Sequence, residues 1–252
     1  MQRAENLRRN LSEKKLVKII AGISNFDVEK VRKVVTAAHK GGANAVDIAA
    51  REELIVATRE ITDMTMFVSS IKPEELAMAA RMGADVLEIG NFDALYAEGL
   101  RISAEEVLEI TRRTMDMAGR DVMYSVTVPG HLDINVQIEL AQKLEAMGVD
   151  MIQSEGAATV DVQSTGARAL VEKAHVTIAN TIELVRNISI PVITASGITS
   201  TTASLAIAAG ASAVGIGSAV NRLSSELEMT ATVMSIVESM SAKSESREEI
   251  HA

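Results

Sequence analysis

Short apolar segments rich in branched residues alternate along this chain with longer segments whose apolar residues recur at helical spacing, for example at Val28–Lys40 and Ala104–Met117. The short segments predict strands and the longer ones predict helices. Eight strands that alternate with helices predict parallel βαβ units, which close most naturally into a (β/α)8 barrel; a doubly wound open sheet is the alternative. The predicted strands are Val17–Gly22, Ala45–Ala49, Met66–Ser70, Asp85–Ile89, Val122–Val128, Met151–Glu155, Pro191–Ser196 and Ala213–Gly217.

A short internal repeat supports a closed barrel. Each copy begins with a glycine suited to a left-handed helix cap and leads into a predicted strand. Reuse of one βα unit produces this kind of recurrence. The copies fall on the second, fourth, sixth and eighth strands, at Gly42–Ile48, Gly83–Ile89, Gly148–Ser154 and Gly210–Ile216.

The pattern divides the chain into one barrel with two flanking segments. Residues 1–15 predict a short amphipathic N-terminal helix, and residues 16–240 carry the barrel. The total of 252 residues suits a single barrel, which needs roughly 250 residues. Residues 241–252 are polar and highly charged, and we expect them to form a disordered tail.

Polar residues occupy predicted strand positions that should face the barrel interior. Asp47, Glu88 and Gln153 each lie five residues after the repeat glycine, between apolar neighbours that would face the outer helices. Barrel interiors are usually filled by branched apolar side chains, so this layer predicts a polar cavity, in which the small residues Gly90, Gly215 and Gly217 would leave room. The odd strands add Lys18, Ser125 and Thr127. Lys18 has a second interpretation, as a structural ion pair with a carboxylate such as Asp47 or Glu88 near the barrel floor.

The last two strand-to-helix junctions are rich in glycine and predict a phosphate site. Glycines allow backbone N–H groups to approach an anion, and helix N-termini add unpaired donors. Barrels frequently hold phosphate in the loops after strands seven and eight. The residues that we expect to bind phosphate are Ser196, Gly197, Gly217, Ser218 and Ala219. Two tight turns without a ligand are the alternative.

Further candidate residues follow the other strands. Asn91 and Asp93 follow strand four, where they would contact substrate, or Asp93 would cap a helix. Glu155 ends strand six, and the long loop 156–166 after it is a candidate lid. Lys173 would reach an anionic substrate or lie solvated on its helix. His131 is more easily explained as an exposed loop residue than as an acid–base group.

Composition narrows the function classes. The formal net charge is −9 and aromatic residues make up 2% of the chain, which argues against nucleic-acid binding. There are no cysteines, so disulfides and thiolate zinc sites are excluded, and no spacing of His, Asp and Glu resembles a zinc site. No segment resembles a signal peptide or a convincing membrane span.

Several motifs occur in order between about Lys18 and Val237: KIIAGISNFD, AVDIAA, EIGNFDALYAEG, SVTVPGHL, IQSEG, VEKAHVT, ASGIT and GIGSAVN. Together they resemble a cyanobacterial and plastid family, the hypothetical chloroplast reading frame numbered twenty-three. This resemblance implies an aldolase-type barrel in a cyanobacterial cytoplasm or a plastid stroma, and it supplies no established reaction. The ends of strands seven and eight also resemble phosphate-binding barrels of histidine, tryptophan and thiazole biosynthesis.

The leading hypothesis is therefore an isomerase, lyase or synthase of a small phosphorylated metabolite. Asp47, Glu88 and Glu155 are its acid–base candidates, and Lys18 or Lys173 would form an imine or stabilise negative charge. Asn91, Ser125, Thr127 and Gln153 would bind substrate. The alternatives are a non-catalytic metabolite sensor or interaction protein and an enzyme that uses flavin mononucleotide (FMN). A homo-oligomer is compatible with each of these hypotheses.

Overall fold

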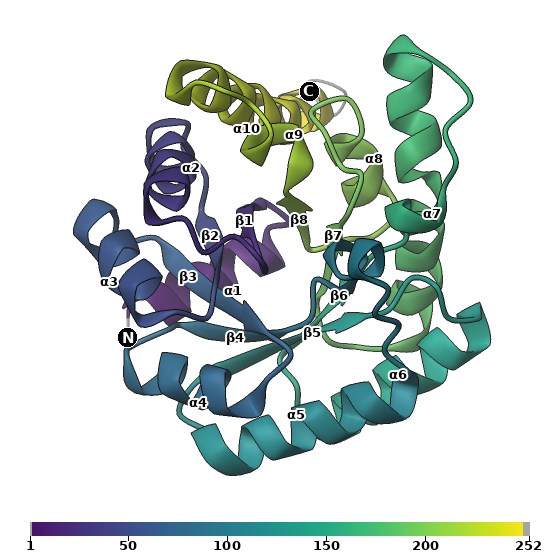
Figure 1. Cartoon of the computed structure of the whole chain (residues 1–252). Coiled ribbons are helices and arrows are strands. Elements are labelled where there is room, and N and C mark those ends of the chain that lie inside the picture. The colour runs from purple at the N-terminus through teal and green to yellow at the C-terminus, as the bar shows by residue number, and fades with distance from the viewer. Residues whose placement is uncertain (1, 249–252) are drawn as a thin grey trace.

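In the computed structural model, which describes residues 2–248, eight parallel strands form one closed barrel (Figure 1). Each strand pairs with the next, and β8 returns to β1, where Lys18 lies opposite both Ala45 and Gly215. The predicted (β/α)8 architecture is confirmed. The strands are β1 Leu16–Gly22, β2 Ala45–Ala49, β3 Thr65–Ser70, β4 Val86–Ile89, β5 Met123–Val128, β6 Met151–Ser154, β7 Val192–Ala195 and β8 Ala213–Ile216.

Helices surround the barrel, and the predicted N-terminal helix is present as α1 (Figure 1). Asp27 begins α2 by accepting the amides of Glu29 and Lys30, and Ser103 and Glu106 form a capping box on α5. The helices are α1 Gln2–Ser12, α2 Val28–Lys40, α3 Glu52–Ile61, α4 Pro73–Arg81, α5 Ala104–Ala118, α6 Ile134–Ala146, α7 Gly166–Asn187, α8 Ala203–Ala208, α9 Ser218–Asn221 and α10 Glu226–Glu248, with short 3-10 helices η1 Phe92–Ala94, η2 Tyr96–Glu98 and η3 Ala157–Thr159.

The four repeats have one shared geometry. Their glycines all have positive φ, between 82° and 108°, as the predicted left-handed caps require. The third residue of each repeat donates its backbone amide to the preceding strand. In three copies its side chain also accepts an amide from that strand, in the pairs Asn44–Val17 at 2.9 Å, Asp85–Met66 at 2.9 Å and Asp150–Tyr124 at 2.8 Å. The repeat therefore fixes the register of neighbouring strands.

Helix α1 covers the floor of the barrel. In Figure 1 it lies behind the strands, at the end opposite the viewer. Its Leu7 and Leu11 are buried against the lowest interior layer, which includes Leu16 and Phe67. Burial of a leucine side chain stabilises a fold by about 1.5–3 kcal/mol. The outward-facing strand residues, such as Val46, join a separate core beneath the outer helices.

The C-terminal segment differs from the prediction. The disordered tail expected from Ser241 is not seen over 241–248, where α10 continues to Glu248, and residues 249–252 lie outside the described part. Extending a formed helix adds one hydrogen bond for each residue fixed, so it avoids the cost of nucleation. The segment also contains good helix formers, including Ala242, Lys243 and Arg247. Its charged composition alone did not reveal this continuation.

Candidate functional site

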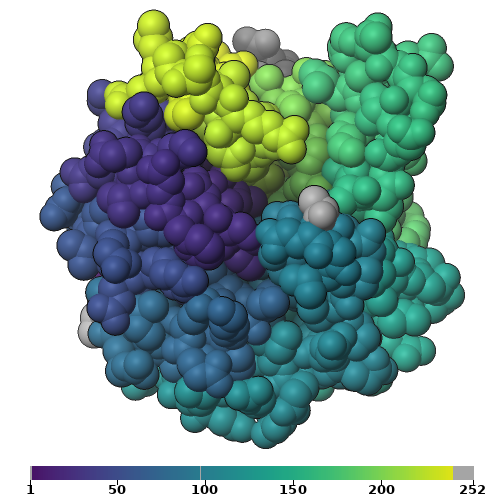
Figure 2. Space-filling view, in the orientation of Figure 1, coloured from purple at the N-terminus to yellow at the C-terminus, as the bar shows by residue number. Residues whose placement is uncertain are grey.

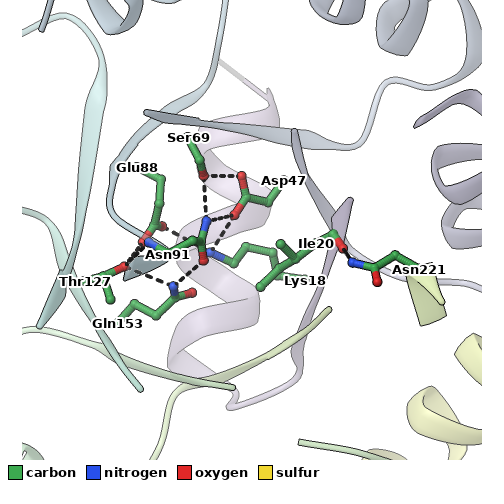
Figure 3. Close-up of polar contacts among 9 residues, drawn as sticks. All are labelled: Lys18, Ile20, Asp47, Ser69, Glu88, Asn91, Thr127, Gln153 and Asn221. Atoms are coloured by element: carbon green, nitrogen blue, oxygen red, sulfur yellow. Dashed lines mark hydrogen bonds and ion pairs between the residues drawn. The ribbon is translucent and has the colours of Figure 1, made fainter. Parts of the chain in front are cut away.

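A layer of charged side chains lies inside the barrel. The Lys18 ammonium is 3.1 Å from Glu88 Oε2 and 3.5 Å from Asp47 Oδ2, as Figure 3 shows. None of the three side chains is more than 1% exposed. The ammonium also lies 4.5 Å from the centroid of the Phe67 ring. The predicted inward orientation is confirmed, and the geometry matches the ion-pair interpretation of Lys18.

Two amide side chains lie above these charges. Asn91 Nδ2 donates to Asp47 Oδ2 at 2.9 Å, and Gln153 Nε2 donates to Asn91 Oδ1 at 2.8 Å (Figure 3). Gln153 Nε2 also donates to Thr127 Oγ1 at 3.1 Å, and Thr127 donates to Glu88 at 2.8 Å. The backbone of Asn91 is left-handed, with φ of 66°. We call Lys18, Asp47, Glu88, Thr127 and their partner Ser69 the sealed layer.

One ammonium in the sealed layer faces two carboxylates. Burial raises the pKa of Glu88 above its usual value, and the charge of Asp47 raises that pKa further, against the opposing effect of Lys18. Desolvation disfavours a charged carboxylate, so Glu88 holds a proton more readily than an exposed glutamate. The layer therefore combines a charge pair with a protonatable group.

Gly90 has a different role from the predicted one. We expected Gly90, Gly215 and Gly217 to leave open space. A Cβ on Gly90 would lie 2.2 Å from Thr127 Oγ1, so the space is already filled by that side chain. A Cβ on Gly217 would have its nearest neighbours at 3.7 Å or more. A Cβ on Gly215 would lie 2.8 Å from the Ala195 Cβ and 3.2 Å from Ile20 Cδ1, so of these three glycines only Gly217 has room for a Cβ, as the sequence predicted.

A cavity of about 410 Å³ opens above the sealed layer at the carboxyl ends of the strands. Figure 2 views this face, where the hollow lies between the purple β1 loop, the teal segment after β4 and the green C-terminal segments. Asn91 and Gln153 contribute to its wall, whereas Lys18, Asp47 and Glu88 do not line it. We call this space the mouth cavity. Its other lining residues include Asp93, Glu155, Lys173, Ser196, Gly197, Gly217, Ser218 and Arg222.

The two predicted glycine-rich turns border the same cavity, because β7 and β8 are neighbours. Ser196 and Gly197 both have positive φ, of 77° and 74°. The first amides of α9 have no partner within that helix, as at any helix start. One detail was not anticipated: the Ser196 hydroxyl donates to Asp93 Oδ2. Asp93 also accepts the Ala158 amide at 3.0 Å, so its carboxylate joins two loops and does not cap a helix.

Glu155 lies in the wall of the mouth cavity and is 2% exposed. Its carboxyl accepts from the Tyr96 hydroxyl at 3.0 Å and from the Asp93 amide at 3.1 Å. Burial raises the pKa of Glu155 well above its usual value, and nearby Asp93 adds to the rise. The Tyr96 hydroxyl also lies 2.9 Å from His131 Nδ1. A hydrogen-bonded chain thus connects the cavity wall to His131.

His131 is half-buried in this chain, in contrast to the exposed loop histidine we expected. Burial lowers its pKa, and the charge of Arg101 lowers it further. Its ring meets that of Tyr96 edge-on, with centroids 5.1 Å apart. A neutral imidazole at this position accepts or donates at Nδ1 according to its tautomer.

The loop after β6 is fastened to α7. The amides of Gln163 and Ser164 donate to the Glu172 carboxylate at 2.8 and 3.1 Å. Lys173 Nζ donates to Val160 O at 3.1 Å, so this lysine holds the loop while it lines the cavity. The lid role stays a prediction.

Several residues of the site were not found from the sequence. Ser69 donates to Asp47, and its alternation with inward-facing Phe67 was a usable signal. Asn221 Nδ2 donates to Ile20 O at 3.0 Å and ties the end of α9 to β1 (Figure 3). Arg222 lines the cavity, and no spacing pattern marked it.

Two features are absent from the described residues. Among residues 2–248, no group of three or more His, Cys, Asp or Glu side chains is arranged to hold a metal ion. Over the same range, no helix has the length and apolar character needed to cross a membrane.

The closed sheet and its surrounding helices define the class: a (β/α)8 barrel with a polar cavity at its mouth. Among solved structures, the chain is similar to KGPDC of Streptococcus mutans, with a TM-score of 0.61 and 12% identity over 91% of this chain and 98% of that one. It is also similar to thiamine phosphate pyrophosphorylase of Pyrococcus furiosus, with a TM-score of 0.55 and 20% identity over 92% and 98% of the chains. Identities at this level establish the fold alone.

Residues 1–246 match the family described as protein of unknown function DUF561, and the chain belongs to this family. Its relatives include the uncharacterized protein ycf23 of Cyanophora paradoxa, 40% identical over 87% of this chain and 90% of that protein. Another is the ycf23 protein of Pyropia yezoensis, 33% identical over 92% and 85%. The resemblance inferred from the ordered motifs is confirmed.

Proposed function

We propose that this protein is an enzyme that binds a small phosphorylated metabolite in the mouth cavity and moves a proton on its carbon skeleton. The reaction would be an isomerisation, a carbon–carbon cleavage or a condensation. One observation carries the proposal: two glycine-rich turns and a buried carboxyl with a raised pKa open into a single cavity. The solved neighbours include a synthase in complex with its substrate sn-glycerol-1-phosphate and a 3-hexulose-6-phosphate synthase, which supports a phosphorylated ligand.

In this proposal, the backbone around Gly197, Gly217, Ser218 and Ala219 holds the phosphate, with Ser196 beside it, and Arg222 adds positive charge. A bound phosphate positions the reacting carbons without taking part in bond changes.

Glu155 is the proposed acid–base group, because it lines the cavity and its raised pKa lets it hold a proton more readily than an exposed glutamate does. The Tyr96 hydroxyl donates to Glu155 in the structure, so with Glu155 protonated this hydroxyl would first turn to donate to His131 Nδ1. A proton lost from Glu155 would then pass to the Tyr96 oxygen as the Tyr96 hydroxyl proton passes to His131 Nδ1. His131 would then release a proton from its other nitrogen to water. Lys173 is the proposed imine or charge-stabilising residue at the cavity, and Lys18, Asp47 and Glu88 would act on the reaction through Asn91 and Gln153. Ser125 and Thr127 stay predictions as substrate contacts.

Calorimetric titration with D-ribose 5-phosphate and with D-ribose tests the phosphate site. We expect only the phosphate ester to bind, and Ser218→Glu to weaken it at least tenfold by placing a carboxylate at the turn. The control Ser12→Glu adds the same charge on the floor side, at the end of α1, and should bind like the wild type. Equal binding of ribose, or unchanged binding by Ser218→Glu, would refute the proposal.

Deuterium exchange separates an enzyme from a sensor. When the protein is incubated with its ligand in D₂O, the wild type should incorporate deuterium at a carbon atom of the ligand. The Glu155→Gln variant should not. Binding without exchange or turnover would favour the sensor. Yellow protein that releases flavin on denaturation would favour the FMN alternative.

The proposal has three further parts. The protein would be located in a plastid stroma or in a cytoplasm, it would have no nucleic-acid or membrane partner, and it would form a homo-oligomer.

A further inference from the structure

The two amide side chains below the mouth cavity donate their hydrogens to the protein itself. Asn91 Nδ2 donates to Asp47 Oδ2 and to Ser69 Oγ, both at 2.9 Å. Gln153 Nε2 donates to Asn91 Oδ1 at 2.8 Å and to Thr127 Oγ1 at 3.1 Å (Figure 3). The charge of Asp47 fixes the orientation of the Asn91 amide, and Asn91 Oδ1 fixes that of Gln153. Because a side-chain amide has two N–H hydrogens, neither residue keeps one for a ligand.

Other polar side chains of the lining are also satisfied within the protein. The Ser196 hydroxyl donates to Asp93 Oδ2, and Asn221 Nδ2 donates to Ile20 O at 3.0 Å. The Glu155 carboxyl accepts a hydrogen bond at each of its oxygens. The remaining Asp93 oxygen, Oδ1, is buried out of reach of the cavity. The lining is therefore less able to bind ligand hydroxyls than its residue types suggest.

Apolar side chains supply much of the remaining lining. Ile20 and Ile23 come from the end of β1 and the loop after it, and Ile198 follows the Gly197 turn. Contact with hydrocarbon favours the part of a ligand that has little hydration to lose. Beyond the phosphate turns, a ligand in this cavity therefore meets a largely apolar wall.

The donors that are still available gather at the proposed phosphate site. The side chains of Ser218 and Arg222, which follow β8, have no hydrogen-bond or ion-pair partner among the described residues. Lys173 donates to a neutral backbone carbonyl, and an ammonium can donate more than one hydrogen bond. The polar recognition of a ligand is thus concentrated at its phosphate.

Resting on the proposed function, we infer that the ligand is a phosphate monoester with an apolar carbon body that carries few hydroxyl groups. Its phosphate takes the available donors at the turns after β7 and β8, and its carbon body lies against Ile20, Ile23 and Ile198. A hydroxyl-rich ester exchanges water for a wall that offers its hydroxyls few partners, which is costly. D-ribose 5-phosphate would then bind through its phosphate, and less tightly than an apolar ester.

Calorimetric titration of the full chain with two matched esters tests the inference. n-Butyl phosphate and D-erythritol 4-phosphate have the same number of carbons and the same phosphate, and the second carries hydroxyl groups on its other carbons. We expect n-butyl phosphate to bind about tenfold more tightly. The alcohol 1-butanol, which lacks the phosphate, should not bind. Because these comparisons use the wild-type protein, they do not depend on the folding of a variant.

Two variants locate the preference. Ile23→Thr places a hydroxyl in the apolar wall and should narrow the ratio of the two affinities several-fold. The control Ile102→Thr makes the same change at a similarly buried position that does not line the cavity, and it should keep the wild-type ratio.

The failures of the two proposals are distinguishable. If neither ester binds, or if 1-butanol binds as tightly as n-butyl phosphate, the proposed phosphate site fails together with the inference. If D-erythritol 4-phosphate binds as tightly as n-butyl phosphate or more tightly, the phosphate site stands and the inference of an apolar ligand is overturned. An unchanged ratio in Ile23→Thr would also overturn it, because the wall would not be the origin of the preference.

Discussion

The sealed layer and the mouth cavity hold similar side chains in opposite electrostatic situations. In the sealed layer, Asp47 and Glu88 share the Lys18 ammonium and are covered by amide side chains. In the mouth cavity, Asp93 and Glu155 have neutral partners, and one carboxylate oxygen has none among the described residues. Paired buried charges suit a structural role, and incompletely satisfied groups beside a cavity suit ligand binding. The contrast teaches that burial alone does not distinguish a carboxylate that binds a ligand from one that has a structural role.

The largest expected difference between the two regions comes from their lysines. Lys18→Met leaves two buried carboxylates without their cation and should lower the free energy of unfolding by about 3–5 kcal/mol. Lys173→Met removes a half-buried lysine at the mouth and should cost about 1 kcal/mol or less. Urea unfolding measures both. Equal losses would mean that the two regions do not differ as described.

Glycine substitutions sharpen the same comparison. Gly90→Ala places a Cβ 2.2 Å from Thr127 Oγ1, with the glycine φ at 142°, and should cost about 2–3 kcal/mol of unfolding free energy. Gly217→Ala, with φ of −103°, adds a Cβ that makes only ordinary van der Waals contacts, the nearest at 3.7 Å, and should change stability by about 0.5 kcal/mol or less. Thermal unfolding of both variants checks this, and a tolerated Gly90→Ala would contradict the packing of the sealed layer.

The pH dependence of stability tests Glu155. Its pKa is raised in the folded state, so folding binds a proton, and the stability gained from this is full below the ordinary glutamate pKa and is lost as pH rises through the folded pKa. Glu155→Gln removes this loss. The unfolding free energy of the variant should therefore rise relative to wild type as pH increases, by at most about 1.4 kcal/mol per pH unit. Parallel pH profiles would show that Glu155 has an ordinary pKa.

The smallest stability effect is expected at Arg222, which is exposed at the rim of the cavity. Arg222→Ala should change the free energy of unfolding by about 0.5 kcal/mol or less. The affinity of this variant for D-ribose 5-phosphate should nevertheless fall several-fold. A calorimetric titration showing wild-type affinity would remove Arg222 from the phosphate site.

The fold and the sealed layer followed from the sequence because both depend on periodicity. Alternation placed Asp47, Glu88 and Gln153 inside the barrel, and the repeat aligned their strands. The contacts of the mouth could not be predicted in this way. The bond from Ser196 to Asp93 joins loops 103 residues apart, and the Tyr96–His131 contact depends on a 3-10 segment without a periodic signal. Strand alternation with Phe67 also places Ser69 inside the barrel, but our prediction did not include it.

The most direct test of the central claim is a map of where phosphate binds. Titration of the uniformly ¹⁵N-labelled protein with inorganic phosphate reports every backbone amide separately. The account predicts that the largest, saturable shifts fall on Gly197, Ser218 and Ala219, with Asp93 and Glu155 beside them. A second cavity, lined by Arg3 of α1 and by Arg120 just before β5, lies at the floor. Shifts centred there instead, or no saturable shifts at the β7 and β8 turns, would contradict the account.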